Sequence, residues 1–553
     1  MTGCRAGRAN CSAADTVADP RAQDILRRQG ELAGNRGSFE SMWQQIAERI
    51  LPGSAQFSGR RTPGGQQTEK MFDATAALAL RKYATILESM MTPRNQTWHK
   101  LAAADNDLAE SPVVKRYLGE INKQLFKARY APSSNFSGQS GSSYLELGGF
   151  GNASLFVDEQ PGYGMRYRAI PLAESFWSEN HVGLIDTVYR KFEFTARQAV
   201  QRWRDRCPER IRSAADKNPE SPWVFVHCVR PNSGNDLGDG LLRDHAYESV
   251  YVSEEGQAIV QRGGYYTFPY PIMRDLTSAG ETYGRSPGTW VLPDVKMLNE
   301  MNKTVVRMGH KAVDPPMLAT EDGALSPFDM RPGALNPGTL GPNGEELVKP
   351  LNNQSRFDIG FELMQSKQTT INEAFFITLF QILVDNPKMT ATEVLERAQE
   401  KGMLLGPLMG RQQSEFLGPM VERELDLLAR AGRLPPMPDE LLEAGGEYKI
   451  EYESPLARAQ RAEEGVAIVR TFEAIAPLVE TQPDILDNFD LDETARTLGE
   501  INGMAAKLFR DKDAVDELRE QRAQQQQSTT LAELAPGMAK AAKDVAGIAQ
   551  GRA

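Results

Sequence analysis

The sequence predicts an α+β fold that is mainly α-helical, and three observations support this prediction. Apolar residues recur at helical spacing in three stretches before residue 130. From about residue 133 to 270, short runs of β-branched and aromatic residues alternate with Gly, Pro, Asn and Asp. Helical spacing then returns from residue 292 onward. Because 553 residues exceed one ordinary domain, we expect several cores or one elongated body of several parts.

The composition indicates a soluble folded protein, with a mean hydropathy of -0.46 and no apolar run of the ~18 residues that span a bilayer. Four cysteines, two of them among the first 20 residues, form no disulfide framework and indicate a reducing compartment. The net charge of -11 argues against a broad basic face that grips DNA. The same charge is compatible with a protein past which DNA slides.

The first part of the chain predicts a disordered lead followed by three helices. Residues 1–20 have no apolar core and no signal-peptide pattern. A single helix is expected over residues 22–50, where Pro52 and Gly53 end it. Asp73 is the expected N-cap of a second helix that Pro93 stops, and a third helix covers residues 113–130.

The middle of the chain predicts strands. The Ser/Gly-rich run at 133–143 is typical of a loop, and residues 145–157 contain a turn followed by a strand. One helix, capped by Thr195 and ending at Trp203, interrupts the strands. The further strand candidates are residues 166–171, 182–194, 223–230, 247–252 and 264–270.

The stretch 292–408 is the organising feature of the second half. A helix at 292–313 leads into a Pro/Gly-rich excursion at 314–350, whose length is unusual unless it is functional. A second helix lies within 357–383 and ends in a turn at 384–393. Beyond it we expect a long helix at 390–431 with kinks at Gly406-Pro407 and Gly418-Pro419, a strand at 448–452, two or three helices from 456, and a Gln/Ala-rich tail from 522.

One face of the helix at 292–313 carries a mainly basic stripe. Its charged residues are spaced by four, three, four and four positions, so they line up along the helix: Lys296, Glu300, Lys303, Arg307 and Lys311. Two interpretations fit this stripe. It is either a solvated surface, or a strip that faces a partner or a channel while the helix packs between neighbouring subunits.

The sequence offers little catalytic chemistry. It contains no P-loop, GxGxxG, HExxH or GxSxG motif. His227 and Cys228 are adjacent in a predicted strand, so their side chains point to opposite faces. The acidic run DNFDLDE (Asp487, Asp490, Asp492 and Glu493) lacks the glycine and terminal glutamate of an EF-hand, and helix-start acids explain it better. We therefore expect no catalytic residue, no metal site and no cofactor.

Six segments, in this order, resemble the head-to-tail connector (portal) proteins of short-tailed bacteriophages, the podophages. The resemblance covers about residues 27–527, and the order and spacing of the segments make it specific. The segments are RKYATILESMMTPRNQTWHKL (81–101), GGFGNASLFVDE (148–159), YGRSPGTWVLPDVKMLNEM (283–301), INEAFFITLFQIL (371–383), MTATEVLERAQEKGMLLGPLMGRQQSEFLGPMVER (389–423) and YESPLARAQRA (452–462).

The resemblance implies a non-enzymatic dodecameric ring at one capsid vertex, through which double-stranded DNA passes during packaging and ejection. Its subunit architecture would have a wing, a two-helix stem, a clip and a helical crown. The implied regions are a disordered lead at 1–20, a wing at 21–291, stem helices at 292–313 and 357–383, a clip at 314–356, a channel loop at 384–392, a long wing helix and strand at 393–455, crown helices at 456–521 and a tail at 522–553.

The resemblance also implies partners. These are the terminase large subunit and later the tail adaptor proteins at the clip, together with the major capsid and scaffolding proteins, and no membrane. The protein would be part of the virion and would assemble in the host cytoplasm. From their positions, the expected DNA-channel contacts are Lys388, Asn386, Lys296, Lys303, Arg307 and Lys311. Two alternatives remain open, a soluble enzyme of unknown chemistry and another tail or scaffold component of the virion.

Overall fold

The structure is a computed structural model with an α+β fold, so the predicted fold class is confirmed. None of the helices in the described part of the chain is long and apolar enough to span a membrane. The structure describes residues 19–54, 56–59, 64–65, 67–105, 108–109, 111–160, 162, 164–232, 245–319, 329, 331, 333–351, 357–377, 406–452, 455–501, 504, 508–510, 514–522 and 524–525.

The chain divides into two compact units. Unit 1 comprises Met1–Trp98 and Leu125–Arg433, and unit 2 comprises His99–Gln124 and Leu434–Ala553. The predicted helix at 113–130 is α5 (Pro112–Arg129), which enters unit 1 at Leu125. Each unit is described separately below.

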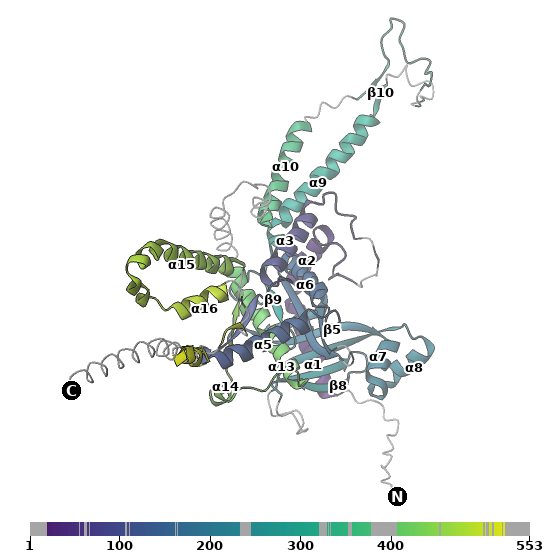
Figure 1. The fold of residues 1–553 in the computed structure, drawn as a ribbon. Helices are drawn as coiled ribbons and strands as arrows, with labels where there is room; N and C mark the ends of the chain where they lie inside the picture. Colours follow the sequence, from purple (N-terminus) through teal and green to yellow (C-terminus); the bar gives the residue numbers. More distant parts are fainter. Residues whose placement is uncertain are drawn as a thin grey trace, which may run out of the picture. The chain divides into compact units, whose positions relative to one another are not determined.

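Unit 1 contains a five-stranded antiparallel sheet with the order β4-β5-β6-β7-β8. Alternating residues of its strands enter two different cores. Val226 and Cys228 pack with α1 (Pro20–Asn35), whereas Phe225 packs with α7 (Ala196–Trp203) and α8 (Glu209–Lys217). The sheet is therefore covered by helices on both faces (Figure 1). Its strands are β4 (Ser175–Glu179), β5 (Ile185–Thr195), β6 (Pro222–Pro231), β7 (Tyr247–Ser253) and β8 (Ala258–Tyr265).

Several sequence predictions in this sheet are confirmed, and others are wrong. Thr195 caps α7 in a capping box with Gln198, as predicted. The strand predicted at 264–270 has the wrong bounds, because the observed strand β8 ends at Tyr265. The chain beyond it still contributes the carbonyls of Pro269 and Pro271 to β2, but prolines have no N–H with which to complete a ladder. Helix α8, which the sequence analysis did not predict, adds a second helix to this region.

The predicted single helix at 22–50 is two helices, α1 and α2 (Gly37–Arg49), which meet at Arg36. The guanidinium of Arg36 is buried, donates to the backbone carbonyls of Leu172, Ala173 and Ser175, and lies 3.8 Å above the ring of Phe176. These tertiary contacts hold the chain at the break between the two helices.

The predicted loop at 133–143 is wrong, because this run begins the buried helix α6 (Phe136–Phe150). Serines and glycines are poor helix formers, but here they allow close packing. A Cβ on Gly148 would lie 2.7 Å from side-chain atoms of Leu80 and Tyr83 on α3 (Thr75–Met91). Ser143 donates back to the carbonyl of Gln139, four residues earlier, at 3.1 Å. Tertiary packing therefore overrides the local propensity of this segment.

Helix α6 leads into a three-stranded sheet with the order β3-β2-β9. All its strand pairs are antiparallel, and β2 is the central strand. The predicted turn and strand at 145–157 correspond to Gly151, which has φ +77°, and to β2. The three strands are β2 (Asn152–Gln160), β3 (Gly164–Ile170) and β9 (Ile272–Arg274).

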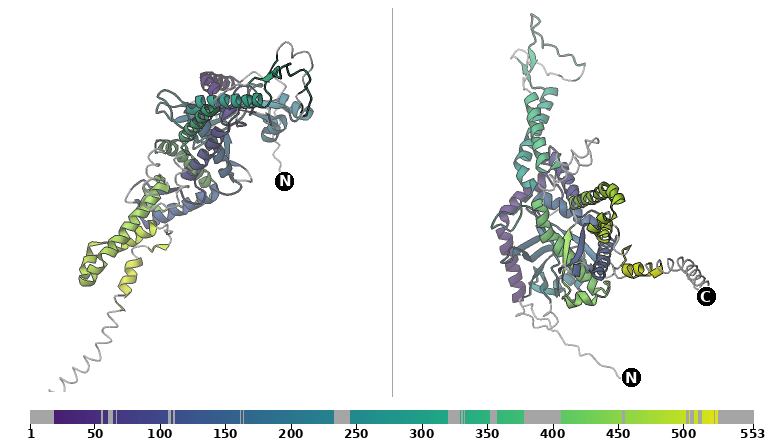
Figure 2. Two further views of the ribbon diagram at one scale, coloured as in Figure 1. Left: turned by 90° about the horizontal axis from the view of Figure 1, so that it is seen from above. Right: turned by 60° about the vertical axis from the view of Figure 1, so that its left-hand side comes forward.

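The predicted helices at 292–313 and within 357–383 are α9 (Pro287–Val313) and α10 (Phe357–Ala374). They lie side by side in every view (Figures 1 and 2). The excursion between them contains a short antiparallel pair that was not predicted, β10 (Met317–Ala319) and β11 (Val348–Pro350). This pair brings the two ends of the excursion together next to the end of α9.

The predicted long helix at 390–431 is described only from residue 406. Its predicted kink at Gly418-Pro419 coincides with a π-helical turn, η5 (Gln413–Leu417), which is followed by α13 (Gly418–Arg430). Proline lacks the N–H that would continue an α-helical ladder, which explains a change of helical pitch here. The predicted turn at 384–393 lies outside the described residues.

Unit 2 contains the strand predicted at 448–452, which is β12 (Tyr448–Tyr452) with identical bounds. It pairs antiparallel with β1 (His99–Ala103), a strand that the sequence did not predict. The helices expected from residue 456 are present in the described part of this unit. Unit 2 also contains α14 (Asp439–Glu443), α15 (Pro455–Thr481), η6 (Pro483–Asn488) and α16 (Leu491–Ile501).

Candidate functional site

The candidate functional site is the helix pair α9 and α10, together with the residues that bind the start of α9. Helix α9 begins with a capping box, in which Ser286 and Thr289 exchange side-chain and backbone hydrogen bonds, and with Pro287 at its first turn. The hydroxyl of Ser286 also donates to the carbonyl of Gly149 at 2.7 Å. The same residue thus starts α9 and attaches it to the end of α6.

Three glycines allow the backbone at the base of α9 to cross that at the end of α6. A Cβ on Gly288 would lie 2.7 Å from the carbonyl oxygen of Gly149, and one on Gly151 would lie 2.7 Å from that of Gly284. Asn152 joins the two segments, because its amide donates to the carbonyl of Gly284 at 2.8 Å and accepts from its N–H at 2.8 Å. No side chain fits between these backbones, which explains the glycines.

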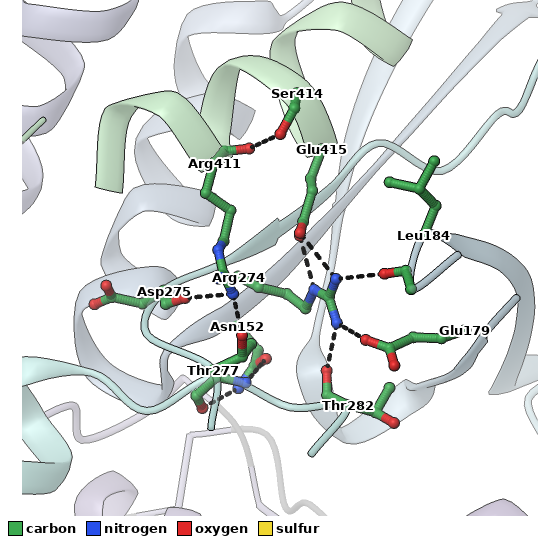
Figure 3. Close-up of polar contacts among 12 residues, drawn as sticks. Asn152, Glu179, Leu184, Arg274, Asp275, Thr277, Thr282, Arg411, Ser414 and Glu415 are labelled. Carbon is green, nitrogen blue, oxygen red and sulfur yellow. Dashed lines mark hydrogen bonds and ion pairs between the residues drawn. The ribbon is translucent and has the colours of Figure 1, made fainter. Parts of the chain in front are cut away.

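Arg274, the last residue of β9, is the centre of the polar contacts at this base (Figure 3). Its side chain is 3% exposed and binds Glu415 of η5 through two hydrogen bonds of 2.7 and 2.8 Å. It also donates to Glu179 at the end of β4 and to the carbonyls of Thr282 and Gly183. Burial disfavours its charge, but the hydrogen bonds to Glu415 and Glu179 outweigh burial and raise the pKa of Arg274.

The helical residues before η5 bind the same segment. The amide of Gln412 donates to the carbonyl of Arg274 at 2.6 Å. The guanidinium of Arg411 donates to the carbonyl of Asp275 at 3.3 Å and to the hydroxyl of Thr277 (Figure 3). Desolvation raises the pKa of the Asp275 carboxyl to about 7, although the N–H of Leu276 and the charge of Arg411 act in the opposite direction.

We call this set of contacts the base junction; it comprises segment 272–288 and the residues of α6, β2, β4 and 406–417 that bind it. The start of α9 lies within it, and so does the described start of the helix that returns at residue 406. The segment from 287 to 405 therefore starts and ends at the base junction.

Above the base junction, α9 and α10 are joined by polar contacts that meet at Asp73. Its carboxylate accepts from Asn302 of α9 at 2.9 Å, from Gln368 of α10 at 3.1 Å, and from the N–H of Thr75 at 2.8 Å. The predicted N-cap Asp73 thus lies one residue before the observed cap position, Ala74, and also connects three helices. Lys367 of α10 forms an ion pair with Asp294 of α9 at 2.8 Å.

The structure places the predicted DNA contacts of α9 in different environments. Lys303 is half-buried, lies 3.7 Å from Glu300, and has its ammonium 5.5 Å from the ring centre of Phe72. Lys296 is half-buried, whereas Arg307 and Lys311 are exposed. The other two predicted contacts, Asn386 and Lys388, lie outside the described residues.

The residues that offered catalytic alternatives have structural roles. His227 is buried and hydrogen-bonded to Tyr270 and Ser249, and burial lowers its pKa well below the usual range. Cys228 lies in the core on the opposite face of β6. Asp490 accepts from the N–H groups of Asp492 and Glu493 at the start of α16, as expected of helix-start acids. The described residues contain no cluster of His, Cys, Asp and Glu able to hold a metal ion.

Sequence reasoning did not select Arg274, Glu415 or Arg411. These residues lie in no motif, and the partners in the Arg274–Glu415 pair are 141 positions apart. Opposite charges at such a separation give no signal in a single sequence, because charged residues are frequent along the whole chain. In the sequence, only the glycines near residues 148–151 and 284–288 could have indicated that these two backbone segments lie close together.

Comparison with known proteins shows what the chain is similar to. A family model described as bacteriophage head to tail connecting protein matches residues 22–509. The probable portal protein of Bordetella phage BPP-1 is 29% identical over 525 residues, which cover 92% of each chain. The portal protein of Salmonella phage epsilon15 is 28% identical over 537 residues, covering 95% of this chain and 96% of the relative.

Among solved structures, a chain from the neck of an empty gene transfer agent particle covers 77% of this chain and is itself covered to 94%. Its identity is 11% and its TM-score is 0.37, too low to inform the fold. The family match, in contrast, covers most of both compact units and the whole segment from 287 to 405. The chain therefore belongs to the family of bacteriophage head-to-tail connecting proteins, which includes these portal proteins.

Proposed function

We propose that this portal protein forms a closed dodecameric ring at one capsid vertex and conducts double-stranded DNA through the axis of that ring during packaging and ejection. The observation that supports the proposal best is the match to the connector family over residues 22–509. The segment from 287 to 405 agrees with it. Both of its ends lie at the base junction, so the helices α9 and α10 can form part of a channel wall.

In this proposal the regions expected from the sequence keep their assignments. The wing comprises residues 21–291 and the segment 393–455, and the stem comprises residues 292–313, which lie in α9, and residues 357–383. The clip is 314–356, the channel loop is 384–392, and the crown is 456–521, with the tail at 522–553 beyond it. The short β10–β11 pair would then lie within the clip, next to the stem.

The proposed partners follow from these assignments. The clip would bind the terminase large subunit during packaging and the tail adaptor proteins afterwards, and the wing would meet the major capsid and scaffolding proteins. Assembly would take place in the host cytoplasm, and the finished ring would remain in the virion. The proposed function requires no cofactor.

Charge supports the proposed passage of DNA. A duplex carries about one negative charge per 1.7 Å, so a channel with many cations would retain it. The chain has a net charge of -11, and a ring of such chains would hold DNA only at a few local cations. Lys388 and Asn386 in the channel loop, together with Lys296, Lys303, Arg307 and Lys311 on the stem, are the proposed contacts.

Native mass spectrometry and electron microscopy of the purified full-length protein test the ring. We expect particles of about a dozen chains with a central hole. A protein that stays monomeric, both alone and with its capsid proteins, would contradict the proposal. The channel loop is tested by Lys388→Ala in a DNA-packaging assay, with the exposed Lys217→Ala on α8 as the matched control. Only the first variant should change the packaged amount of DNA.

A further inference from the structure

One face of the five-stranded sheet meets the three-stranded sheet in a layer of polar and aromatic side chains. Arg190, His227 and Tyr251 lie opposite one another on β5, β6 and β7, so they share that face. The ring of His227 stacks on that of Tyr251 at 3.9 Å. From the other sheet, the ring of Phe156 on β2 lies 6.0 Å from that of His227. The two sheets therefore meet at these side chains.

Three arginines from three different elements border this layer. Arg168 of β3 lies opposite Phe156 of β2, so both side chains are on the same face of their sheet. The guanidinium of Arg202 on α7 lies 4.6 Å from the ring centre of Tyr251. The third is Arg190, which is buried, whereas Arg168 and Arg202 are exposed.

The hydroxyl of Tyr270 lies where the three guanidiniums approach one another. It is hydrogen-bonded to Nδ1 of His227 at 2.6 Å. Burial raises the pKa of Tyr270, and the charges of all three arginines act in the opposite direction. Arg168, Arg190 and Arg202 are therefore all close to this one hydroxyl, although they come from different parts of unit 1.

The acids of this layer do not balance the three arginines. Glu174 accepts two hydrogen bonds from Arg190, at 3.0 Å from Nε and 2.9 Å from Nη2. Neither Arg168 nor Arg202 forms an ion pair within the described residues. Burial and the charge of Arg190 lower the pKa of Arg168, although Glu174 acts in the opposite direction. Arg168 therefore experiences more repulsion than attraction.

Asp158 does not supply the missing negative charge. It lies on the same face of β2 as Phe156, but its carboxylate is bound by Arg423 at 3.1 Å. Burial raises the pKa of this carboxyl despite the charge of Arg423. Two exposed guanidiniums at the border of a buried polar layer therefore remain available to an anion from outside the chain.

We infer that Arg168 and Arg202, supported by the charge of Arg190, bind a phosphate group. Planar guanidiniums donate two parallel hydrogen bonds to phosphate oxygens. A free or terminal phosphate carries nearly two negative charges at pH 7 and at least three acceptor oxygens, so it satisfies two guanidiniums at once. A carboxylate has one charge and two oxygens, and it would leave part of the repulsion in place.

A phosphate bound in this place would connect the two sheets. Arg168 belongs to the three-stranded sheet, whereas Arg202 belongs to α7, which packs on the five-stranded sheet. The ligand would replace repulsion between these elements by attraction to a common anion. Two sources offer this chemistry, free phosphate and the phosphate at the end of a DNA strand, and the experiment below distinguishes them.

Thermal unfolding and calorimetric titration of the full-length protein test the site. Inorganic phosphate should raise the unfolding temperature above that in chloride of equal ionic strength, because a ligand of the folded chain stabilises it. The double variant Arg168→Gln with Arg202→Gln should lose this rise. Its dissociation constant for inorganic phosphate should be about tenfold higher or more, since hydrogen bonds between charged groups are removed.

The unfolding temperature in chloride separates ligand binding from a purely structural role. Arg168→Gln alone should unfold at or above the wild-type temperature in chloride, because the change relieves the repulsion by Arg190 and Arg202. The same variant should gain less than wild type from inorganic phosphate. A lower unfolding temperature in chloride would mean that the folded chain already supplies the counter-charge of Arg168, and it would contradict the inference.

A matched control accounts for the general stabilisation of proteins by phosphate salts. Arg210→Gln with Arg212→Gln removes two exposed arginines of α8 and should respond to inorganic phosphate like wild type. Circular dichroism checks that each variant is folded. A short DNA duplex with 5′-phosphates that displaces inorganic phosphate would identify a strand end as the source, and failure to displace it would identify free phosphate.

The inference is overturned by either of two results. One is the absence of saturable binding of inorganic phosphate to the wild-type chain. The other is equal affinity of wild type and the Arg168→Gln, Arg202→Gln variant, which would place the bound phosphate elsewhere. None of these measurements depends on ring formation, so a negative result leaves the proposed function intact.

Discussion

Arg274 and Glu415 form a two-fold hydrogen bond, Nε to Oε2 at 2.7 Å and Nη2 to Oε1 at 2.8 Å, that joins β9 to η5. The segment between these two residues contains the whole of α9, the excursion and α10. The pair therefore attaches the helical segment around Glu415 to the end of β9, and the planar guanidinium also fixes its orientation.

Replacing Arg274 by Met should weaken the attachment of residues 406–417 to β9. The change leaves Glu415 and Glu179 without their shared partner in a mostly dry site, which typically costs about 3 kcal/mol. We expect hydrogen exchange to become faster in residues 406–417 and the midpoint of thermal unfolding to fall. The control is Arg331→Met, which removes an ion pair whose arginine is 85% exposed and should leave the stability nearly unchanged. Equal effects of the two variants would contradict the role of Arg274.

Two glycines of α9 should respond in opposite ways to alanine. In Gly288→Ala the new Cβ would meet the carbonyl of Gly149, so the base of α9 must shift at a cost of about 1–3 kcal/mol. In Gly309→Ala nothing lies within 4 Å of the new Cβ, and the better helix propensity of Ala should add about 0.5–1 kcal/mol. Thermal unfolding measures both. A Gly288→Ala variant with unchanged thermal stability would show that the close crossing at the base junction does not exist.

The carboxyl of Asp275 should make stability depend on pH. Its pKa is raised from 3.8 to about 7, so the folded chain holds a proton that the unfolded chain releases between these values. Stability from this group is therefore fully present below about pH 4 and is lost as the pH rises to about 7. At roughly 1.4 kcal/mol per pKa unit, the loss is on the order of 4 kcal/mol.

Denaturant unfolding of Asp275→Asn between pH 4 and pH 8 tests this expectation. The asparagine cannot ionise, so this variant should gain stability relative to wild type as the pH rises. Asp329→Asn is the control, because the hydrogen bonds from Arg331 lower the pKa of Asp329 and give the opposite sign. Parallel pH profiles for wild type and Asp275→Asn would contradict the prediction.

The buried pair Arg129 and Glu424 should show strong coupling. Both side chains are fully buried, and Tyr167 donates a further hydrogen bond to Glu424. Glu424→Leu alone leaves a buried guanidinium without its partner, which costs about 3–5 kcal/mol. Adding Arg129→Met and Tyr167→Phe removes the remaining unpaired polar groups and should restore most of that loss. Additive effects in the mutant cycle would exclude the coupling.

Local signals explain the predictions that were confirmed. The cap at Thr195 and the alternation at 448–452 depend on residues a few positions apart, so they can be read from one sequence. The helices at 292–313 and 357–374 follow from apolar spacing for the same reason. The order of the six connector-like segments was also readable, and it led to the family that the comparison confirmed.

The candidate site was only partly predictable. The basic stripe of α9 was visible from its spacing, but whether its side chains are half-buried, as Lys303 is, depends on Phe72, more than 200 positions away. The channel loop at 384–392 stays a prediction.

By itself, the sequence determined where most helices and some of the strands lie, that the fold is α+β, and which family of phage proteins the chain belongs to. Capping, periodicity and turn chemistry act over a few residues and therefore remain readable in a linear chain. Tertiary structure alone decided that the Ser/Gly-rich run at 133–143 leads into the buried helix α6, that β1 pairs with β12, and that Arg274 meets Glu415. These features depend on close packing and charge pairing between distant segments, whose energies exist only once the chain has folded.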